Sequence, residues 1–581
     1  MKDRLDTYLQ GASYDGYTVF GAHFAHENGE SGVRFTVYAP HAQSVELVGD
    51  FNDWIGWRME RNANGIWSIF ARNLAQGMLY KYRIHAANTI VDRADPFAFY
   101  AEKRPDTASV IWGISHYVWQ DEVYLRSRSK NFDRPMSIYE LHVGSWKQHA
   151  DGSFYGYKEL AEELIPYLLK MGYTHIECMP LTEHPFDGSW GYQTSGYFAA
   201  TSRYGTPDEL MAFIDHCHQA GIGCILDFVP LHFVTDMHAL QAFDGSYLYE
   251  SDDESARYTE WGTLLFDYTK PHVLSFMKSA LDFWIRQYHM DGIRFDAVSG
   301  LIYRGGDPAR GVNDAGVWFL KNANFTLSQA WPDVMLIAED SSIYPKVTAP
   351  VPYGGLGFDY KWDLGFMNDT LRYLSSEHRE SDRISASTEY FYQEKYILPF
   401  SHDEVVHCKR TLLEKMPGSR AVQFAQLRTL FLYSFTHPGK KLNFMGNDFA
   451  VNHEWNEVNE LDWDLLHQHE HAGFQRYFAA LNGLYISHSA LFTMDLHPAA
   501  FCWRRADHGV FVYERNDLHG QCLLIALNFS PHTQHTSLQA GAWCIVLSSD
   551  EATYGGNATL SLAPDGKSVI LPPYCGCVLE E

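Results

Sequence analysis

Four short stretches of the chain place ionisable side chains at or beside the end of an apolar run. They read LDFVPLHF, GIRFDAV, VMLIAED and FSHDE. Carboxylates delivered from separate strands suit glycoside chemistry, because one can attack a sugar carbon while another protonates the leaving oxygen. A single aspartate at a strand end is more often a turn or cap residue, but several on separate strands indicate a reaction site.

The second stretch holds the most unusual pair. Residues 292–298 read as a short strand on which Arg294 and Asp296 share one face, since successive side chains point to opposite sides. Fully buried strands are normally apolar. A neighbouring guanidinium favours an ionised carboxylate, which a nucleophile needs. Glu339 follows the apolar run VMLIA, an approach that favours the protonated form needed by a general acid.

The elements that must position these groups alternate between apolar strands and amphipathic helices from about residue 136 to 480. Eight such units predict a (β/α)8 barrel of the TIM type, whose active-site groups lie at the C-terminal ends of the strands. The longest connection, 230–291, is expected to carry an excursion. The predicted strands are 137–144, 175–181, 221–229, 292–298, 334–340, 357–363, 396–404 and 441–449.

Short alternating runs bounded by Gly, Pro, Asn or Asp flank the barrel on both sides and predict β-sandwiches. The fold class is therefore α/β, with a central barrel between two smaller β domains. The expected parts are a lead-in (1–20), an N-terminal β-sandwich (21–115), the barrel (116–485) and a C-terminal β-sandwich (486–581).

The composition restricts the classes of molecule that the protein could bind. The 581 residues carry a formal net charge of −26, which argues against nucleic acid or an anionic membrane as a partner. We find no signal peptide, no window apolar enough to span a bilayer, and nine scattered cysteines, which together favour reduced thiols in the cytoplasm. The sequence has no Cys/His metal cluster, Gly-rich phosphate loop or GxSxG nucleophile, so we expect neither a metal nor a cofactor.

The four stretches resemble the four short motifs of the α-amylase superfamily. Longer stretches narrow the resemblance to the 1,4-α-glucan (glycogen) branching enzymes, and the likeness covers nearly the whole chain. These stretches include IYELHVGSWK, MPLTEHPFDGSWGYQTSGYFAATSRYGTP, WGTLLFDY, GGLGFDYKWDLGFMNDTLRY and LPFSHDEVVH. The resemblance implies that the N-terminal β-sandwich is a glucan-binding module.

Carried over residue by residue, the resemblance implies that Asp296 is the nucleophile, Glu339 the general acid/base and Asp403 the third carboxylate. Arg294 would position Asp296, and Asp227 would orient the site. The residues implied to contact the reacting sugar are Tyr192, His232 and His402.

The implied reaction has two displacements. Asp296 attacks the anomeric carbon of an α-1,4 linkage, and the resulting glycosyl ester is then attacked by a 6-hydroxyl, which leaves an α-1,6 branch with net retention. The implied substrates are α-1,4-glucans, namely amylose, glycogen and linear maltooligosaccharides. We expect a monomer or a weak homo-oligomer.

Two alternatives remain open. A hydrolase of the same superfamily, of debranching or trehalose-releasing type, would use the same carboxylates with water as acceptor. The loop 299–316 favours it, because this loop is contracted relative to the usual branching enzyme. A non-catalytic glucan binder would lack at least one catalytic carboxylate, whereas this chain has Asp296, Glu339 and Asp403.

The region 443–455 departs from the pattern of the branching enzymes at Asp448, Ala450 and Val451.

Overall fold

The computed structural model describes residues 2–376, 378–538, 542–564 and 566–581. Met1, at the start of the predicted lead-in, and residues 539–541 and 565, within the predicted C-terminal β-sandwich, lie outside the described residues. The described chain divides into two compact units: one contains residues 1–129, 149–162 and 178–358, and the other contains 130–148, 163–177 and 359–581.

Eight strands form the predicted closed barrel, in chain order around the ring. They are β10 (Ser137–Leu141), β11 (His175–Cys178), β14 (Gly223–Phe228), β17 (Gly292–Phe295), β18 (Met335–Ala338), β19 (Tyr360–Trp362), β20 (Tyr396–Phe400) and β21 (Lys440–Phe444). Every residue of these strands is buried. Each strand falls on a predicted apolar run, so the predicted barrel is confirmed.

Within the first unit, three neighbouring strands carry part of the site. β14 pairs in parallel with β17, and β17 pairs in parallel with β18. The register places Asp227 opposite Arg294, and Arg294 opposite Ile337. Strand β17 ends at Phe295, three residues earlier than predicted, because Ala297 takes the left-handed conformation at φ 49° and ends the extended run.

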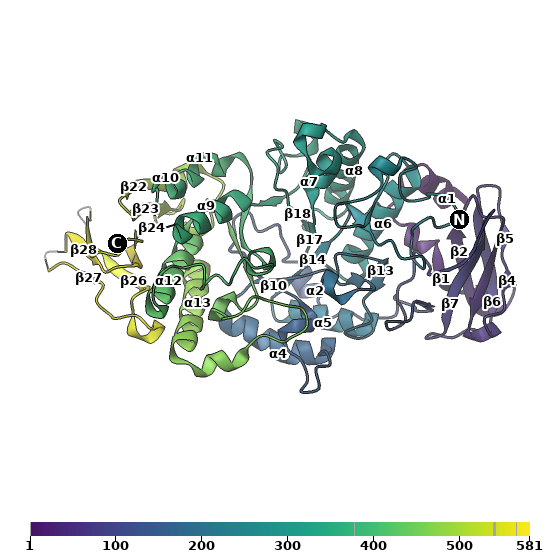
Figure 1. Cartoon of the computed structure of the whole chain (residues 1–581), viewed down its shortest axis with the longest axis horizontal. Helices are drawn as coiled ribbons and strands as arrows, with labels where there is room; N and C mark the ends of the chain where they lie inside the picture. The colour runs from purple at the N-terminus through teal and green to yellow at the C-terminus, as the bar shows by residue number, and fades with distance from the viewer. Residues whose placement is uncertain (1, 377, 539–541, 565) are drawn as a thin grey trace. The chain divides into compact units, whose positions relative to one another are not determined.

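Long helices follow most of the barrel strands along the chain (Figure 1). Helix α5 (Pro207–Gln219) begins with a capping box, in which the Thr206 side chain accepts from the Glu209 backbone N–H and Glu209 reciprocates. The other long barrel helices are α4 (Tyr157–Met171), α6 (Pro271–Gln287), α8 (Asp314–Ala330), α9 (Leu364–Ser375), α12 (Arg420–Thr436) and α13 (His469–Ser487).

The excursion predicted for 230–291 contains a small two-stranded antiparallel sheet. Its strands are β15 (His232–Phe233) and β16 (Leu264–Leu265), and His232 lies opposite Leu265. The lead-in is more ordered than the sequence indicated, because it contains helix α1 (Lys2–Leu9) and is held against α6. The Ser13 and Gly16 backbone N–H groups donate to Ser275 and Ser279 at 3.2 and 3.0 Å.

The N-terminal β region contains two antiparallel sheets, with strand orders β1-β2-β6-β5 and β4-β3-β7-β8. Strand β7 alternates between buried and half-buried residues, as expected for a sheet with one face on a core. The strands are β1 (Gly21–Glu27), β2 (Glu30–Tyr38), β3 (Ser44–Gly49), β4 (Trp57–Arg58), β5 (Glu60–Arg61), β6 (Ile66–Arg72), β7 (Leu79–His85), β8 (Ile90–Arg93) and β9 (Ser109–Val110), which also pairs with β7.

The C-terminal β region lies in the second unit and has a five-stranded and a three-stranded sheet, with orders β22-β23-β24-β29-β26 and β25-β28-β27. Its core includes Val510, Val512, Ala526 and Trp543. The strands are β22 (Phe501–Asp507), β23 (Val510–Asn516), β24 (Cys522–Asn528), β25 (Gln534–Ser537), β26 (Cys544–Ser548), β27 (Ser561–Leu562), β28 (Ser568–Leu571) and β29 (Cys575–Glu580).

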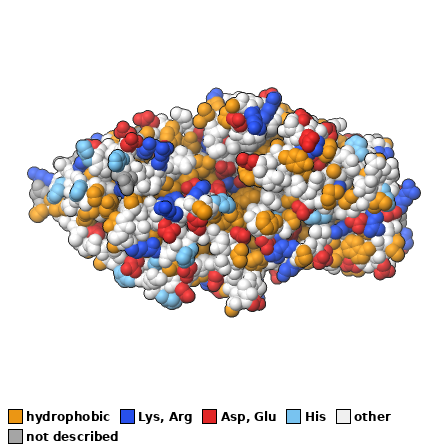
Figure 2. All heavy atoms as spheres, in the orientation of Figure 1, with side chains coloured by type: hydrophobic (Ala, Val, Ile, Leu, Met, Phe, Trp, Pro, Cys, Tyr) orange, Lys and Arg blue, Asp and Glu red, His pale blue; other side chains and the backbone are white. Residues whose placement is uncertain are grey.

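On the face shown in Figure 2, basic and acidic side chains are interspersed over short distances. Among the described residues, no helix has both the length and the apolar character to cross a membrane. The domain bounds proposed from the sequence remain a prediction.

Candidate active site

The centre of the first unit's site is a buried ion pair between neighbouring barrel strands. Arg294 Nη1 donates to Asp227 Oδ1 and Oδ2 at 2.7 and 2.8 Å, and both side chains are only 1% exposed. A buried charge is tolerated only when it is paired and hydrogen-bonded. The pairing follows directly from the register, which places the two residues side by side on β14 and β17.

The same guanidinium reaches two more carboxylates. Arg294 Nη1 donates to Asp296 Oδ1 at 2.8 Å, and its Nη2 lies 4.0 Å from Glu339 Oε2. Burial opposes the charged form of Arg294, but Asp227, Tyr192, Asp296 and Glu339 outweigh it and raise its pKa well above the ordinary value. The arginine in an otherwise apolar strand therefore holds three carboxylates together.

Backbone geometry fixes the two outer carboxylates. Asp296 follows β17, and its N–H donates to the Phe228 carbonyl at 2.9 Å. Glu339 follows β18, and its Oε2 accepts from the Ala297 N–H at 2.8 Å. That bond depends on the left-handed turn at Ala297, a conformation that non-glycine residues seldom adopt. The side chains of Asp296 and Glu339 are 16% and 17% exposed, so both are largely enclosed yet reachable.

Tyr192 joins this network from a loop. Its hydroxyl donates to Asp227 Oδ2 at 2.5 Å, and its ring centroid lies 6.0 Å from the Arg294 guanidinium carbon. The loop turns at Gly191, whose φ is 95°. A Cβ there would lie 2.6 Å from the Pro180 carbonyl oxygen, so the close approach requires glycine.

His232 lies in the same unit at the start of β15. It is 3% exposed, and burial lowers its pKa to about 4, so the imidazole is neutral at physiological pH. Its Nδ1 has no hydrogen-bond partner in the described part of the chain. The ring of Trp261 lies 5.4 Å away, centroid to centroid.

The second unit holds the other two predicted residues. His402 and Asp403 lie in a short 3-10 helix, η9 (His402–Val405), directly after β20. The backbone N–H of His402 donates to Glu140 Oε2 at 2.9 Å, and its Nδ1 lies 2.6 Å from Glu140 Oε1. Its Nε2 lies 3.5 Å from Asp403 Oδ1. Glu140, on β10, therefore orients the His402 ring, while the Asp403 side chain is 55% exposed.

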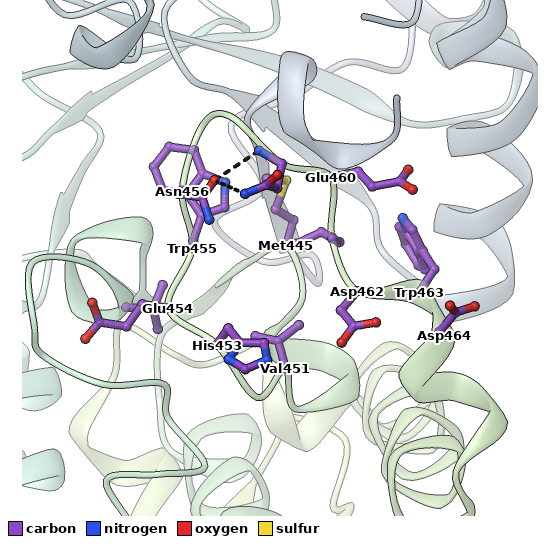
Figure 3. A pocket seen from close by; sticks show the side chains of 13 residues that line it. Met445, Val451, His453, Glu454, Trp455, Asn456, Glu460, Asp462, Trp463 and Asp464 are labelled. Carbon is purple, nitrogen blue, oxygen red and sulfur yellow. Dashed lines mark hydrogen bonds between the residues drawn. The ribbon is translucent and has the colours of Figure 1, made fainter. Parts of the chain in front are cut away.

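A pocket of about 500 Å³ opens in this unit beyond η9 and β21. Figure 3 shows His453, Glu454 and Trp455 on one arm of its loop and Asp462, Trp463 and Asp464 on the other. The Trp455 N–H donates to the Val405 carbonyl at 3.0 Å, which ties the loop to the segment that carries Asp403. Its lining combines carboxylates and amides with two tryptophans and several apolar side chains, and it contains no Lys or Arg.

One group of described residues has metal-ligating side chains close together, namely His218, Cys224 and Asp291. Both ring nitrogens of His218 are already bonded to carboxylates, with Nδ1 2.8 Å from Asp121 and Nε2 3.0 Å from Asp291. The geometry is that of a buried ion-pair cluster.

The structure thus joins Tyr192, Asp227, Arg294, Asp296 and Glu339 in one bonded network. His232 lies in the same unit, and His402 and Asp403 lie together in the other unit. The sequence reasoning missed Glu140 and Trp261. A glutamate inside the apolar run SIYEL was a usable signal for Glu140, since fully buried strands seldom carry a charge.

The family comparisons agree with this architecture. Residues 19–98 match the carbohydrate-binding module 48 (isoamylase N-terminal domain), residues 148–264 match the alpha amylase catalytic domain, and residues 503–580 match the alpha amylase C-terminal all-beta domain.

Two solved structures share the fold. One is a putative alpha amylase from Salmonella typhimurium, with TM-score 0.75 and 18% identity over 97% of this chain and 100% of the other. The other is a pullulanase from Paenibacillus barengoltzii complexed with maltotetraose, with TM-score 0.76 and 19% identity over 97% of this chain and 95% of the other.

Much closer in sequence are curated relatives named 1,4-alpha-glucan branching enzyme GlgB. The relative from Geobacillus stearothermophilus is 45% identical over 96% of this chain and 91% of its own length. The relative from Bacillus mycoides is 43% identical over 98% of this chain and 91% of its own length. At this identity over nearly the full length, the chain belongs to the family of 1,4-alpha-glucan branching enzymes.

Proposed function

We propose that this chain transfers a segment of an α-1,4-glucan to a 6-hydroxyl group of a glucan chain, forming an α-1,6 branch with retention at the anomeric carbon. The observation that carries the proposal is the network in which Arg294 holds Asp227, Asp296 and Glu339. It occurs in a chain 45% identical to a named branching enzyme. The hydrolase alternative is not favoured, because the curated relatives at this identity carry the branching name.

In the first half-reaction, Asp296 attacks the anomeric carbon as a carboxylate and forms the glycosyl ester. Arg294 supports this role, since its permanent positive charge 2.8 Å away favours the ionised form of Asp296. Glu339 gives its proton to the departing glycosidic oxygen, which leaves as the 4-hydroxyl of the released chain. Asp296 and Glu339 both lie within 4.0 Å of the Arg294 guanidinium, as expected for two groups that act on the same bond.

In the second half-reaction, Glu339 takes the proton from an incoming 6-hydroxyl, and the hydroxyl oxygen displaces Asp296 from the anomeric carbon. The two inversions give net retention. Asp296 and Glu339 then return to their starting protonation states. The Ala297 backbone N–H holds Glu339 Oε2 in place for both half-reactions, and the side chain stays partly exposed to the incoming chain.

The remaining residues bind the sugar at the reacting position. Asp403 accepts hydrogen bonds from sugar hydroxyls and stabilises positive charge in the transition state. His402 donates a hydrogen bond to the same sugar, and Glu140 sets the orientation of its ring. His232, neutral because burial lowers its pKa to about 4, contributes a hydrogen bond without adding charge. Tyr192 stacks against the sugar, and Asp227 fixes both Tyr192 and Arg294.

The substrates are amylose, glycogen and linear maltooligosaccharides, and the N-terminal sandwich helps to retain them. We place the reaction in the cytoplasm, which fits nine cysteines that form no disulfide in the described part of the chain, and propose a monomer or a weak homo-oligomer as the active form.

Incubation with amylose tests this function when iodine colour and reducing ends are followed together. A branching transferase lowers the iodine colour with little gain in reducing ends, and a debranching enzyme then releases short chains from the product. A large gain in reducing ends would identify a hydrolase instead. Unchanged amylose that still binds the protein would identify a non-catalytic glucan binder.

A further inference from the structure

A short hairpin over residues 258–264, in the excursion between β14 and β17, exposes a tryptophan. Trp261 lies at its tip, and its side chain is 56% exposed. Tyr258, at the base of the same hairpin, is 47% exposed and forms an isolated β-bridge with Leu264. Single exposed apolar residues are common on protein surfaces and need a second observation before they indicate a function.

The hairpin holds Trp261 in a defined place. The Thr259 N–H donates to the Thr263 carbonyl at 2.9 Å, and the two threonine hydroxyls lie 2.6 Å apart. The Trp261 N–H donates to Thr259 Oγ1 at 3.2 Å. An aromatic side chain on a braced turn loses little conformational entropy when it binds a ligand. The backbone that carries the exposed indole is therefore held in one place.

The second observation is the neighbour of the indole. The Trp261 and His232 ring centroids are 5.4 Å apart at an interplanar angle of 46°. The β15–β16 pairing fixes this proximity, because it places His232 opposite Leu265 on the strand that follows the hairpin tip. His232 is buried, and its Nδ1 has no partner among the described residues. An exposed aromatic face therefore adjoins a histidine proposed to contact substrate.

We propose that Trp261 is a stacking platform for a glucose unit of the glucan chain, next to the unit that His232 contacts. This proposal rests on the proposed function and extends it by one subsite. The apolar C–H face of a pyranose ring matches an indole face in size, and covering the indole removes apolar area from water. Trp261 thus acts in chain binding and takes no part in proton transfer.

Kinetics with amylose test the platform through Trp261→Ala, with Trp261→Phe as the conservative variant. We expect KM to rise about tenfold in Trp261→Ala. We expect kcat to stay within about threefold, since bond cleavage uses other residues, and Trp261→Phe to recover most of the loss. The matched control is Trp318→Ala, which removes a tryptophan that is 51% exposed on α8 in the same unit. It should leave KM unchanged.

Binding without turnover separates this proposal from the proposed function. Titration calorimetry with maltoheptaose compares Asp296→Asn with Asp296→Asn/Trp261→Ala, and the platform predicts weaker binding in the second variant. If the wild-type chain does not branch amylose but the affinity difference persists, the proposed function fails and the platform stands. Equal affinity and equal KM in variants whose thermal unfolding matches wild type would overturn the platform.

Discussion

Arg294 shows how one side chain sets the charge balance of a site. It is buried, and it contacts Asp227 and Asp296 while lying near Glu339. A lysine at this position would offer a single ammonium and could not reach all three carboxylates in the fork geometry of a guanidinium. The two carboxylates proposed to react therefore depend on a shared positive partner as well as on their own chemistry.

The first prediction concerns those two carboxylates. We expect Asp296→Asn and Glu339→Gln each to lower kcat on amylose by about a thousandfold or more, because an amide can neither form the glycosyl ester nor exchange the proton. Both substitutions preserve size, so circular dichroism and thermal unfolding should remain close to wild type. The control is Asp106→Asn on an exposed loop of the same unit. Turnover near wild type in either variant would refute the assigned roles.

The second prediction concerns Glu140, which touches His402 but is not proposed to touch substrate. Glu140→Gln loses the charge that holds His402 Nδ1–H, so we expect kcat to fall about tenfold or more. Because Glu140 acts through His402, the variant should add little further loss in a His402→Ala background. Steady-state kinetics of the two single variants and the double variant measure this coupling. Fully additive losses would show that Glu140 acts independently of His402.

A site residue could be predicted from the sequence when the pattern that marks it lies within a few neighbouring residues. Asp296 with Arg294, and Glu339 after its apolar run, could be predicted because the signal lies within a few residues of the chain. The contact of Glu140 with His402 joins residues 262 positions apart, and the contact of Trp261 with His232 depends on the pairing of β15 with β16. Such contacts arise from strand order and register, which a single sequence does not specify at side-chain resolution.

At the scale of elements, the apolar runs predicted all eight barrel strands but not where each one ends. Strand β17 stops at Phe295 because Ala297 turns left-handed to donate its N–H to Glu339. The end of β17 is therefore tied to a contact with the residue that follows the neighbouring strand. Helix α1 was missed because the segment KDRLDTYL is polar and short, and because the helix that it contacts, α6, lies far along the chain.

The third prediction concerns the stability effect of a strained residue at the end of the short helix after β21. Ala450 ends this helix, η10 (Asn447–Phe449), at φ 58° and ψ 57°, a left-handed conformation that costs an L-residue about 1–2 kcal/mol. Ala450→Gly removes this strain, and we expect the free energy of unfolding to rise by about 0.5–1 kcal/mol. Urea unfolding measures it. Ala323→Gly, inside helix α8, is the control and should lower stability. A fall at both positions would contradict the strain argument.

At the scale of the whole molecule, one buried cluster ties distant segments of the first unit together. His218, on α5, lies 2.8 Å from Asp121 and 3.0 Å from Asp291, one through each ring nitrogen. An imidazole donates from both nitrogens only when it is protonated. Burial alone would lower the pKa of His218, but Asp291 and Asp121 outweigh it and raise the pKa to about 9. The cluster is therefore charged at neutral pH.

The final prediction is the pH dependence that this cluster gives to folding. The folded pKa of His218 is about 9, against about 6.5 in the unfolded chain. Its stabilising contribution is therefore complete below pH 6.5 and is lost as pH rises through 9. We expect His218→Gln to lower the free energy of unfolding most at low pH, and the gap from wild type to shrink by roughly 3 kcal/mol between pH 6.5 and 9.5.

Urea unfolding of both proteins across this pH range measures the gap, and His41→Gln is the control. His41 also faces a carboxylate, Asp244, at 3.1 Å, but its side chain is 63% exposed, so solvent screens the pair and the gap should stay small at every pH. A His218→Gln gap that does not change with pH would mean that the ring is neutral in the folded protein. A neutral ring donates from one nitrogen only. In that case either Asp121 or Asp291 would have to be protonated to donate to the other nitrogen.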